Sequence, residues 1–246
     1  MPCLDIKDGK IVKGVHFVNL IDAGDPISAA QAYEKDGADE IAFLDITATV
    51  ENRKTTLSLV RNISKLICIP LTVGGGIDSL TTAAHVVEAG ATRISVSSKA
   101  VRNPRLINSL AEELGPEKTV VAIDVDFSKI TPSGYEVYID GGRTPTGIDA
   151  IKWCEEAEKR GAGILLPTSK ACDGVKKGYD LALIKQIKKA VDIPVVASGG
   201  AGERDHFLQA ANAGADYLLA ASVFHFGKIK ISELKDYLAA NGVNTL

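Results

Sequence analysis

The segment IPLTVGGGI at residues 69–77 recurs, with substitutions, as IPVVASGGAG at residues 193–202. Each copy begins with Ile-Pro, continues with a short apolar run and then reaches a cluster of glycines. The tripeptide AGA at residues 89–91 recurs at residues 213–215 with the same offset of 124 residues. A repeat of this length indicates that the chain consists of two similar halves in tandem.

Short runs rich in Val, Ile and Leu recur along the chain, and each is followed by turn residues and a segment with helical spacing of its apolar positions. The runs are continuous rather than alternating, which is typical of parallel strands buried on both faces. Strands are therefore predicted at residues 2–6, 40–46, 70–73, 93–97, 119–125, 164–169, 194–197 and 217–221.

Repeated β and α units within 246 residues predict an α/β protein, a single (β/α)8 TIM barrel. An open doubly wound sheet is the alternative, but its usual GxGxxG is absent from CLDIKDGKIVKG, residues 3–14, where the first strand ends. The repeat favours the barrel. We expect one domain over residues 1–246, built from half-barrels at approximately residues 1–118 and 119–246 and related by a pseudo-twofold axis.

The charged residues are interspersed, with 28 Lys and Arg, 31 Asp and Glu and a formal net charge of −3. No basic stripe is present, so we expect no nucleic-acid partner. No apolar run approaches the roughly 20 residues needed to span a bilayer, and no basic and apolar leader precedes PCLDI. These features predict a cytoplasmic protein without a membrane partner.

The cysteines and histidines show none of the spacings of a disulfide framework or a metal site. The cysteines lie far apart and form no CxxC, which indicates a reducing compartment. The histidines form no HExxH or other ligand spacing, so we expect no metal. The residues concerned are Cys3, Cys68, Cys154, Cys172, His16, His85, His206 and His225.

The glycine clusters predict two phosphate sites. Glycine lets the backbone approach a ligand closely, and N–H groups at the start of a helix bind anions. In TIM barrels phosphate commonly lies after strands 7 and 8, here ASGGAG at 197–202 and AASVFHF at 220–226, which could open a short helix. The 124-residue offset places VGGGI at 73–77 and SVSSKA at 95–100 across the mouth. Two such sites predict a substrate phosphorylated at both ends, whereas the alternative is that the glycines only form tight turns.

Aspartates stand at the ends of three predicted strands, namely Asp5, Asp45 and Asp124. Burial and neighbouring charge tune a carboxylate at this end of a barrel strand toward proton transfer. Asp45 is instead expected to cap a helix or accept backbone hydrogen bonds. Asp5 and Asp124 begin the two halves and should face each other as an acid and base pair. Lys13, in the long turn after the first strand, could hold phosphate or a developing negative charge, or could be a solvated lysine.

Motifs in a fixed order extend this interpretation over nearly the whole chain. They are PCLDIKDGKIVKG, FLDITAT, TVGGGI, VVAIDVD, DGVKKGYD, ASGGAG and LAASVFHF. With them the chain resembles the cyclase subunits of imidazole glycerol phosphate synthase. The related isomerase of histidine biosynthesis shares the half-barrel repeat but lacks PCLD and AASVFHF.

The resemblance implies a lyase of histidine biosynthesis that needs no cofactor. It would convert N′-phosphoribulosyl-formimino-AICAR-phosphate and ammonia into imidazole glycerol phosphate and AICAR. Asp5 and Asp124 would be the general acid and base, with Lys13 in a mobile first loop. One phosphate would be bound by Gly76, Ser97 and Ser98, and the other by Asp173, Gly174, Ser198, Gly200, Ala221 and Ser222.

Two segments depart from the family pattern. Ser97, Ser98 and Lys99 replace Asn-Thr followed by a small residue. The segment ILLPTSKACDGV at residues 164–175 keeps Asp173 and Gly174 but is changed at Ile164, Pro167, Lys170, Ala171 and Val175.

A third departure concerns the ring of charged residues that, in the family, admits ammonia from a glutaminase at the opposite end of the barrel. Glu40 is kept and Arg93 stands in a Lys position, but Ile164 replaces a Glu. The chain also begins too close to the first strand to supply the usual Arg. These changes weaken the expectation of a glutaminase partner.

The lysines of the changed segments support an alternative function. A lysine in an apolar barrel mouth has a lowered pKa and can form a Schiff base, as in an aldolase or retro-aldolase. Strand alternation from Thr168 would direct Lys170 into the mouth, while Ala171 and Val175 remove polar groups near it. Lys99 is the second candidate nucleophile. Both lysines could instead assist phosphate binding.

Overall fold

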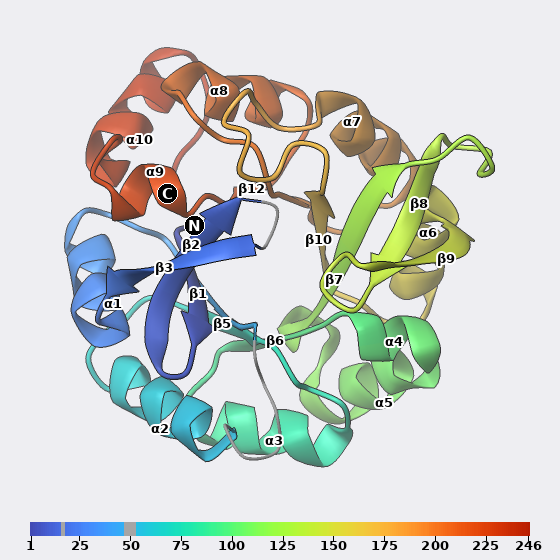
Figure 1. Ribbon diagram of the computed structural model, residues 1–246, viewed down its shortest axis with the longest axis horizontal. Coiled ribbons are helices and arrows are strands. Elements are labelled where there is room, and N and C mark those ends of the chain that lie inside the picture. The colour runs from blue at the N-terminus through green and yellow to red at the C-terminus, as the bar shows by residue number, and fades with distance from the viewer. Residues whose placement is uncertain (16–17, 47–52) are drawn as a thin grey trace.

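A computed structural model describes residues 1–15, 18–46 and 53–246, with the backbone alone at residues 13–15, 18–23 and 53–55. Parallel strands surround a central axis and helices lie outside them (Figure 1). The barrel strands are β1 (Cys3–Lys7), β4 (Ile41–Asp45), β5 (Leu71–Gly74), β6 (Arg93–Val96), β7 (Thr119–Phe127), β10 (Ile164–Ser169), β11 (Val196–Ala197) and β12 (Tyr217–Leu218).

The strands close into a cylinder. Parallel pairing runs from β1 through β4, β5, β6 and β7 to β10, and β11 pairs with β12 in parallel. Bridges between Leu165 and Val195 and between Thr168 and Ser198 join β10 to the β11 segment. A last bridge, between Pro2 and Ala220, closes the ring. The predicted (β/α)8 barrel is confirmed.

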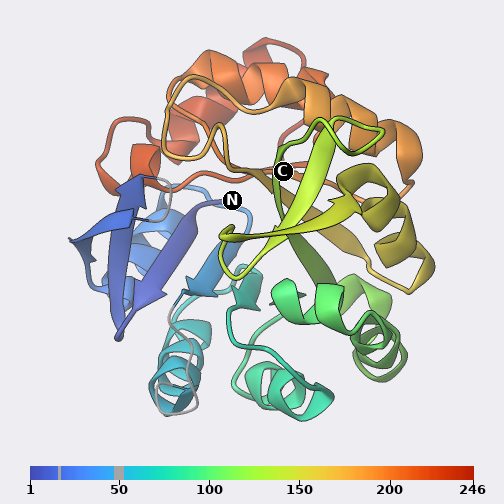
Figure 2. The same ribbon diagram turned by 45° about the vertical axis from the view of Figure 1, so that its right-hand side comes forward.

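An outer layer of helices covers the strands (Figures 1 and 2). Its long helices are α1 (Pro26–Lys35), α2 (Arg53–Ser64), α3 (Leu80–Glu88), α5 (Arg105–Leu114), α6 (Ala150–Lys159), α7 (Leu181–Ala190), α8 (Arg204–Asn212) and α10 (Ile231–Ala240). Shorter pieces are α4 (Ser98–Arg102), α9 (Ser222–His225) and the 3-10 turn η1 (Pro116–Lys118). Among the described residues, no helix combines the length and the hydropathy needed to cross a membrane.

The core has two layers because most of the barrel strands bury residues on both of their faces. Inside the barrel, Cys3, Ala42, Val120, Ile164, Leu166, Val196 and Leu219 pack together. The neighbouring residues on the same strands, such as Phe43 and Val121, face the helices and join the larger cluster outside. This double burial explains why the strands are continuous apolar runs in the sequence.

Two hairpins were not expected from the sequence. After β1, the strands β2 (Lys10–Val15) and β3 (Val18–Gly24) pair in antiparallel fashion. After β7, β8 (Tyr135–Ile139) and β9 (Thr144–Asp149) do the same. Each hairpin follows the first strand of its half, so the repeat extends to them. The expected long turn after the first strand is therefore wrong, because this segment pairs with β1 and extends the sheet.

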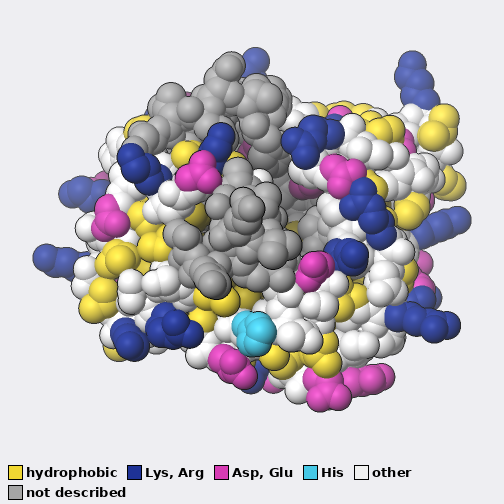
Figure 3. Space-filling view, turned by 60° about the horizontal axis from the view of Figure 1, so that its bottom comes forward, with side chains coloured by type: hydrophobic (Ala, Val, Ile, Leu, Met, Phe, Trp, Pro, Cys, Tyr) yellow, Lys and Arg dark blue, Asp and Glu magenta, His cyan; other side chains and the backbone are white. Residues whose placement is uncertain are grey.

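Surface charge is mixed in the part of the molecule that the structure describes. On the face drawn in Figure 3, Lys and Arg side chains are scattered among Asp and Glu. The described residues of that face therefore form no basic stripe.

Candidate active site

A pocket of about 720 Å³ opens at the carboxyl ends of the barrel strands. Its described lining comes from both halves of the chain, from strand ends and from the turns that follow them. This is the end of a TIM barrel at which active sites lie. The pocket is therefore the candidate active site.

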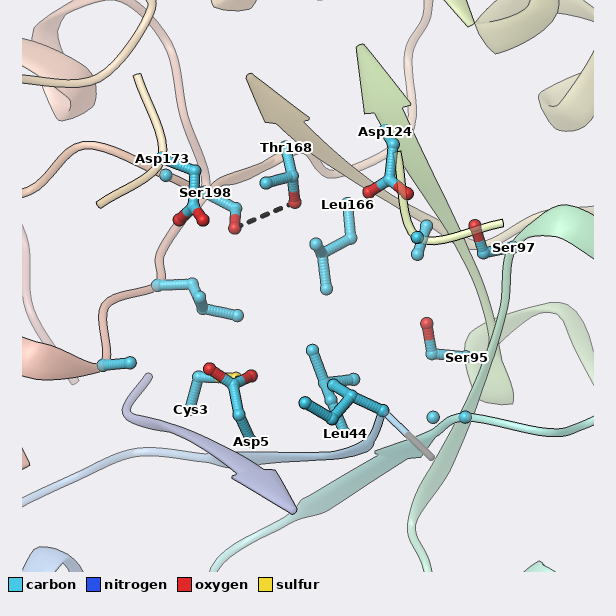
Figure 4. A pocket seen from close by; sticks show the side chains of 18 of the residues that line it. Cys3, Asp5, Leu44, Ser95, Ser97, Asp124, Leu166, Thr168, Asp173 and Ser198 are labelled. Atoms are coloured by element: carbon cyan, nitrogen blue, oxygen red, sulfur yellow. Dashed lines mark hydrogen bonds between the residues drawn. The ribbon is translucent and has the colours of Figure 1, made fainter. Parts of the chain in front are cut away.

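The carboxylates of Asp5 and Asp124 point into this pocket from opposite sides (Figure 4). Asp5 lies on β1 and Asp124 on β7, the first barrel strands of the two halves. The Sγ of Cys3, two residues before Asp5, donates a hydrogen bond of 3.5 Å to Asp5 Oδ1. The structure thus brings the two carboxylates predicted to act in catalysis into one cavity.

The environment of Asp124 raises its pKa to about 6. Burial is the largest cause, and the negative charge of Asp173 acts in the same direction. The positive charge of Lys170 and a hydrogen bond from the backbone N–H of Gly142 oppose the increase. A carboxyl group with such a pKa can exchange protons near neutral pH.

The first predicted phosphate cup, made of Gly76, Ser97 and Ser98, lines one side of the pocket. Ser97 precedes α4, which begins at Ser98. The Oγ of Ser98 accepts a hydrogen bond of 2.8 Å from the backbone N–H of Asp140. Ser98 is thus tied to the β8–β9 turn of the other half.

The second predicted cup lies across the mouth and contains Asp173, Gly174, Ser198, Gly200, Ala221 and Ser222, all of which line the pocket. Asp173 and Ser198 lie side by side in Figure 4. The Oγ1 of Thr168 donates a hydrogen bond of 3.0 Å to Ser198 Oγ. The short helix expected after the eighth strand is present as α9.

The glycines of both cups also have a packing role. Gly75 has φ +100°, and a Cβ atom there would lie 2.0 Å from the carbonyl oxygen of Asp45. Gly200 has φ +107°, and its Cβ would lie 2.0 Å from the carbonyl oxygen of Gly178. Tight turns therefore require glycine at these positions whether or not phosphate binds.

Asp45 is buried and lines the pocket. Its carboxylate accepts a hydrogen bond from the Oγ1 of Thr56 on α2. This hydrogen bond from a side-chain hydroxyl fits the expectation of a hydrogen-bonding role.

The expectation that Lys170 points into the mouth is wrong. Lys170 is not among the described residues that line the pocket. Its Nζ lies 3.2 Å from Asp126 Oδ2 and 3.6 Å from the centre of the Tyr138 ring. The β7–β8 pair therefore holds the ammonium group.

The other two predicted lysines have different outcomes. Lys99 lines the pocket but is exposed to solvent, so it lacks the apolar surroundings that a Schiff-base lysine needs. Lys13 belongs to β2, and its side chain lies outside the described residues.

Cations at the rim were missed by the sequence analysis. Arg102, Arg143 and Lys176 line the pocket together with Lys99. Arg143 follows a Gly-Gly pair in the β8–β9 turn, so recognising this hairpin from the repeat would have pointed to it. Arg102 ends α4 and carries no comparable sequence signal.

No group of three or more His, Cys, Asp or Glu side chains that could hold a metal ion occurs within residues 1–15, 18–46 and 53–246 as far as their side chains are described.

The family model for histidine biosynthesis proteins matches residues 1–230. The chain belongs to the histidine biosynthesis protein family. One member similar to it, the imidazole glycerol phosphate synthase subunit HisF of Thermobifida fusca, is 49% identical over 245 residues, which cover 98% of this chain and 96% of the relative. The subunit of the same name from Wolinella succinogenes is 50% identical over 243 residues, which cover 99% of this chain and 95% of the relative.

Proposed function

We propose that the protein is the cyclase subunit of an imidazole glycerol phosphate synthase, a lyase of histidine biosynthesis. It converts N′-phosphoribulosyl-formimino-AICAR-phosphate and ammonia into imidazole glycerol phosphate, AICAR and water. Relatives with about half of their residues identical, over nearly the full length of both chains, bear the name of this synthase. The observation that carries the proposal is the placing of Asp5 and Asp124 in one pocket between two cups of Gly and Ser residues.

The two cups account for a substrate with a phosphate at each end. Backbone N–H groups and hydroxyls at Gly76, Ser97 and Ser98 bind one phosphate, and the start of α9 at Ser222 contributes to the other. Lys99 and Lys176 at the rim add positive charge. Bound at both ends, the substrate places its reacting carbon atoms between the two carboxylates.

Lys13 belongs to the β2 strand of the first hairpin, and we assign it to substrate binding. In this proposal its ammonium group neutralises phosphate or the negative charge that develops during the reaction.

Asp124 acts as the general base and Asp5 as the general acid. The nitrogen of ammonia must lose protons as it forms bonds to carbon, and the departing amine of AICAR must gain one. With a pKa of about 6, Asp124 is mostly ionised above neutral pH and can accept a proton. Asp5 faces it across the mouth and supplies the proton to the leaving group. The proton taken up by Asp124 is then returned to solvent.

Turnover of the purified protein with the bisphosphate substrate and an ammonium salt tests the proposal. Asp5→Asn and Asp124→Asn should each lower kcat by about 10²-fold or more, the usual contribution of a positioned acid or base. Asp192→Asn, at an exposed position outside the pocket, serves as the matched control and should keep full activity. The wild-type kcat/KM should fall as the pH drops below about 6. Two fully active Asp variants, or a wild type without turnover, would rule the proposal out.

A partner supplies the ammonia in this proposal, since the relatives are named as subunits of a synthase. We propose a glutaminase that docks at the amino ends of the barrel strands. There Arg93 Nη1 lies 2.5 Å from Glu40 Oε2, and Thr72 Oγ1 donates a hydrogen bond to the same carboxylate. The apolar Ile164 contributes no charge to this end. We also propose a cytoplasmic location, which the absence of any CxxC pair supports.

A further inference from the structure

The turn between β8 and β9, residues 140–143, reaches from the second half of the barrel toward α4 (Figure 1). Asp140, Gly141 and Arg143 line the pocket. Three consecutive residues, Asp140, Gly141 and Gly142, have positive φ values of 58°, 64° and 75°. Glycine adopts this conformation readily, but an aspartate there is uncommon and needs support from its surroundings.

That support comes from α4. Arg102 Nη2 lies 2.8 Å from Asp140 Oδ1 and 2.7 Å from Oδ2. The Asp140 N–H donates to Ser98 Oγ at 2.8 Å, and Thr144 Oγ1 donates to Asp140 Oδ2 at 3.1 Å. The hydrogen bond from Arg102 is the main cause that lowers the pKa of the Asp140 carboxyl, so the ion pair persists well below neutral pH.

The other side of the turn reaches the acid–base machinery. The backbone N–H of Gly142 acts on the carboxylate of Asp124, whose ionised form it favours. A Cβ atom at Gly142 would lie 3.1 Å from Cδ of Lys170, so the turn fits closely against that side chain. One short turn therefore touches both Ser98 of the first phosphate cup and Asp124.

We propose that Arg102 and Asp140 are positioning residues that hold the β8–β9 turn so that Gly142 orients Asp124 next to the first phosphate cup. This inference rests on the proposed function, because it assigns the roles of base to Asp124 and of phosphate contact to Ser98. Exposed ion pairs stabilise proteins little, and both side chains here are well exposed. The pair therefore acts on the geometry of the site more than on the stability of the fold.

The pH dependence provides a readout that a purely structural pair would not change. The groups that face Asp124 are Asp173 from the segment after β10, Lys170 at the end of β10, Asp5 across the mouth and the Gly142 N–H. The N–H favours the ionised carboxylate, so its withdrawal raises the pKa of Asp124 further. The acid limb of kcat/KM then moves to higher pH.

Arg102→Met and Asp140→Gly test the inference, since glycine also relieves the positive φ at residue 140. Each variant should lower kcat by about tenfold, within the range that small displacements of a reacting group produce, and should move the acid limb upward. Arg102→Lys should keep part of the wild-type kcat and part of the wild-type position of the acid limb. The control is Arg204→Met, which removes an ion pair of similar exposure between α8 and α10 and should change neither quantity.

Titration of the Asp124 carboxyl by ¹³C NMR, with Asp124→Asn to assign the signal, gives the same readout without turnover. A higher Asp124 pKa in both variants supports the inference even if the wild type does not convert the substrate, in which case the proposed function alone fails. Unchanged Asp124 pKa and kcat in Arg102→Met and Asp140→Gly would overturn the inference while leaving the proposed function in place.

Discussion

At the scale of single residues, Asp124 has an environment that opposes its ionised form. Its folded-state pKa of about 6 lies above the ordinary value of 3.8. A raised pKa gives its full stabilisation of the folded state when the pH is below the ordinary pKa. This stabilisation is lost as the pH rises through the folded-state pKa. Asp124 therefore destabilises the protein at neutral pH relative to a neutral residue of the same shape.

Asp124→Asn should consequently raise the free energy of unfolding more at high pH than at low pH. From the two pKa values, 3.8 and about 6, the gain at pH 7.5 should exceed that at pH 4.5 by about 2 kcal/mol. Urea unfolding of both proteins at the two pH values measures this difference. A change in the free energy of unfolding that is equal at the two pH values would mean that Asp124 titrates normally.

The aspartates at the strand ends were predictable from the sequence, because each of them follows an apolar run that must lie in the core. Lys170 shows the limit of this reasoning. Alternation fixes the side of the strand toward which a side chain points, but not its height relative to the rim. The groups that hold Lys170 outside the pocket, Asp126 and the Tyr138 ring, belong to a strand pair that the sequence analysis did not recognise.

At the scale of elements, Asp180 joins three parts of the second half. It caps α7 by accepting a hydrogen bond of 3.0 Å from the Leu183 N–H. The same carboxylate accepts hydrogen bonds from Tyr135 Oη on β8, at 2.9 Å, and from Ser169 Oγ on β10, at 3.3 Å. This acceptor raises the pKa of Tyr135, although burial of the phenol is the larger cause.

Asp180→Ala should therefore cost more than the loss of an ordinary helix cap. We expect a decrease of about 3 kcal/mol in the free energy of unfolding, from the lost cap and the buried hydroxyl left without an acceptor. Asp25→Ala, which removes the exposed cap of α1, should cost only about 1 kcal/mol. Urea unfolding of the two variants measures these decreases. Equal decreases in the free energy of unfolding would show that Asp180 acts only as a cap.

The barrel strands were predictable and the hairpin strands were not, for one physical reason. A strand buried on both faces is a continuous apolar run, whereas β2 and β8 carry charged residues such as Lys10 and Glu136. Glu136 is nevertheless buried, and it accepts a hydrogen bond of 2.6 Å from the Gly147 N–H. Such pairing across a hairpin leaves little trace in hydrophobic periodicity.

At the scale of the whole molecule, the boundary between the two half-barrels is a proposal. We place the boundary near residues 118 and 119, where η1 leads into β7. The mouth draws on both halves, whereas the described side chains at the amino end of the barrel line only a narrow pocket. There Glu40, Thr72, Val120, Ile164, Val196 and Tyr217 are among the described residues that leave no space for a water molecule between them.

In the proposed complex, ammonia from the partner would have to pass this layer of side chains, next to which Arg93 pairs with Glu40. We expect glutamine to support turnover only when a glutaminase subunit of a relative is added, whereas ammonium salt should suffice without it. Production of AICAR under the two conditions measures this. Turnover with ammonium but none with glutamine and the added subunit would exclude the partner while leaving the cyclase activity intact.

The bridge between Pro2 and Ala220 has a consequence for how the chain is made. Cys3 N–H donates to the Ala220 carbonyl at 2.9 Å, so the start of β1 finds its neighbour on this side only when the last strand has left the ribosome. Until then the start of β1 and the latest strand to emerge are open edges onto which another chain could add. Contacts between such distant positions also slow folding. The finished cylinder leaves neither of these two strands as an edge, so synthesis is the period in which this sheet is most exposed to association with other nascent chains.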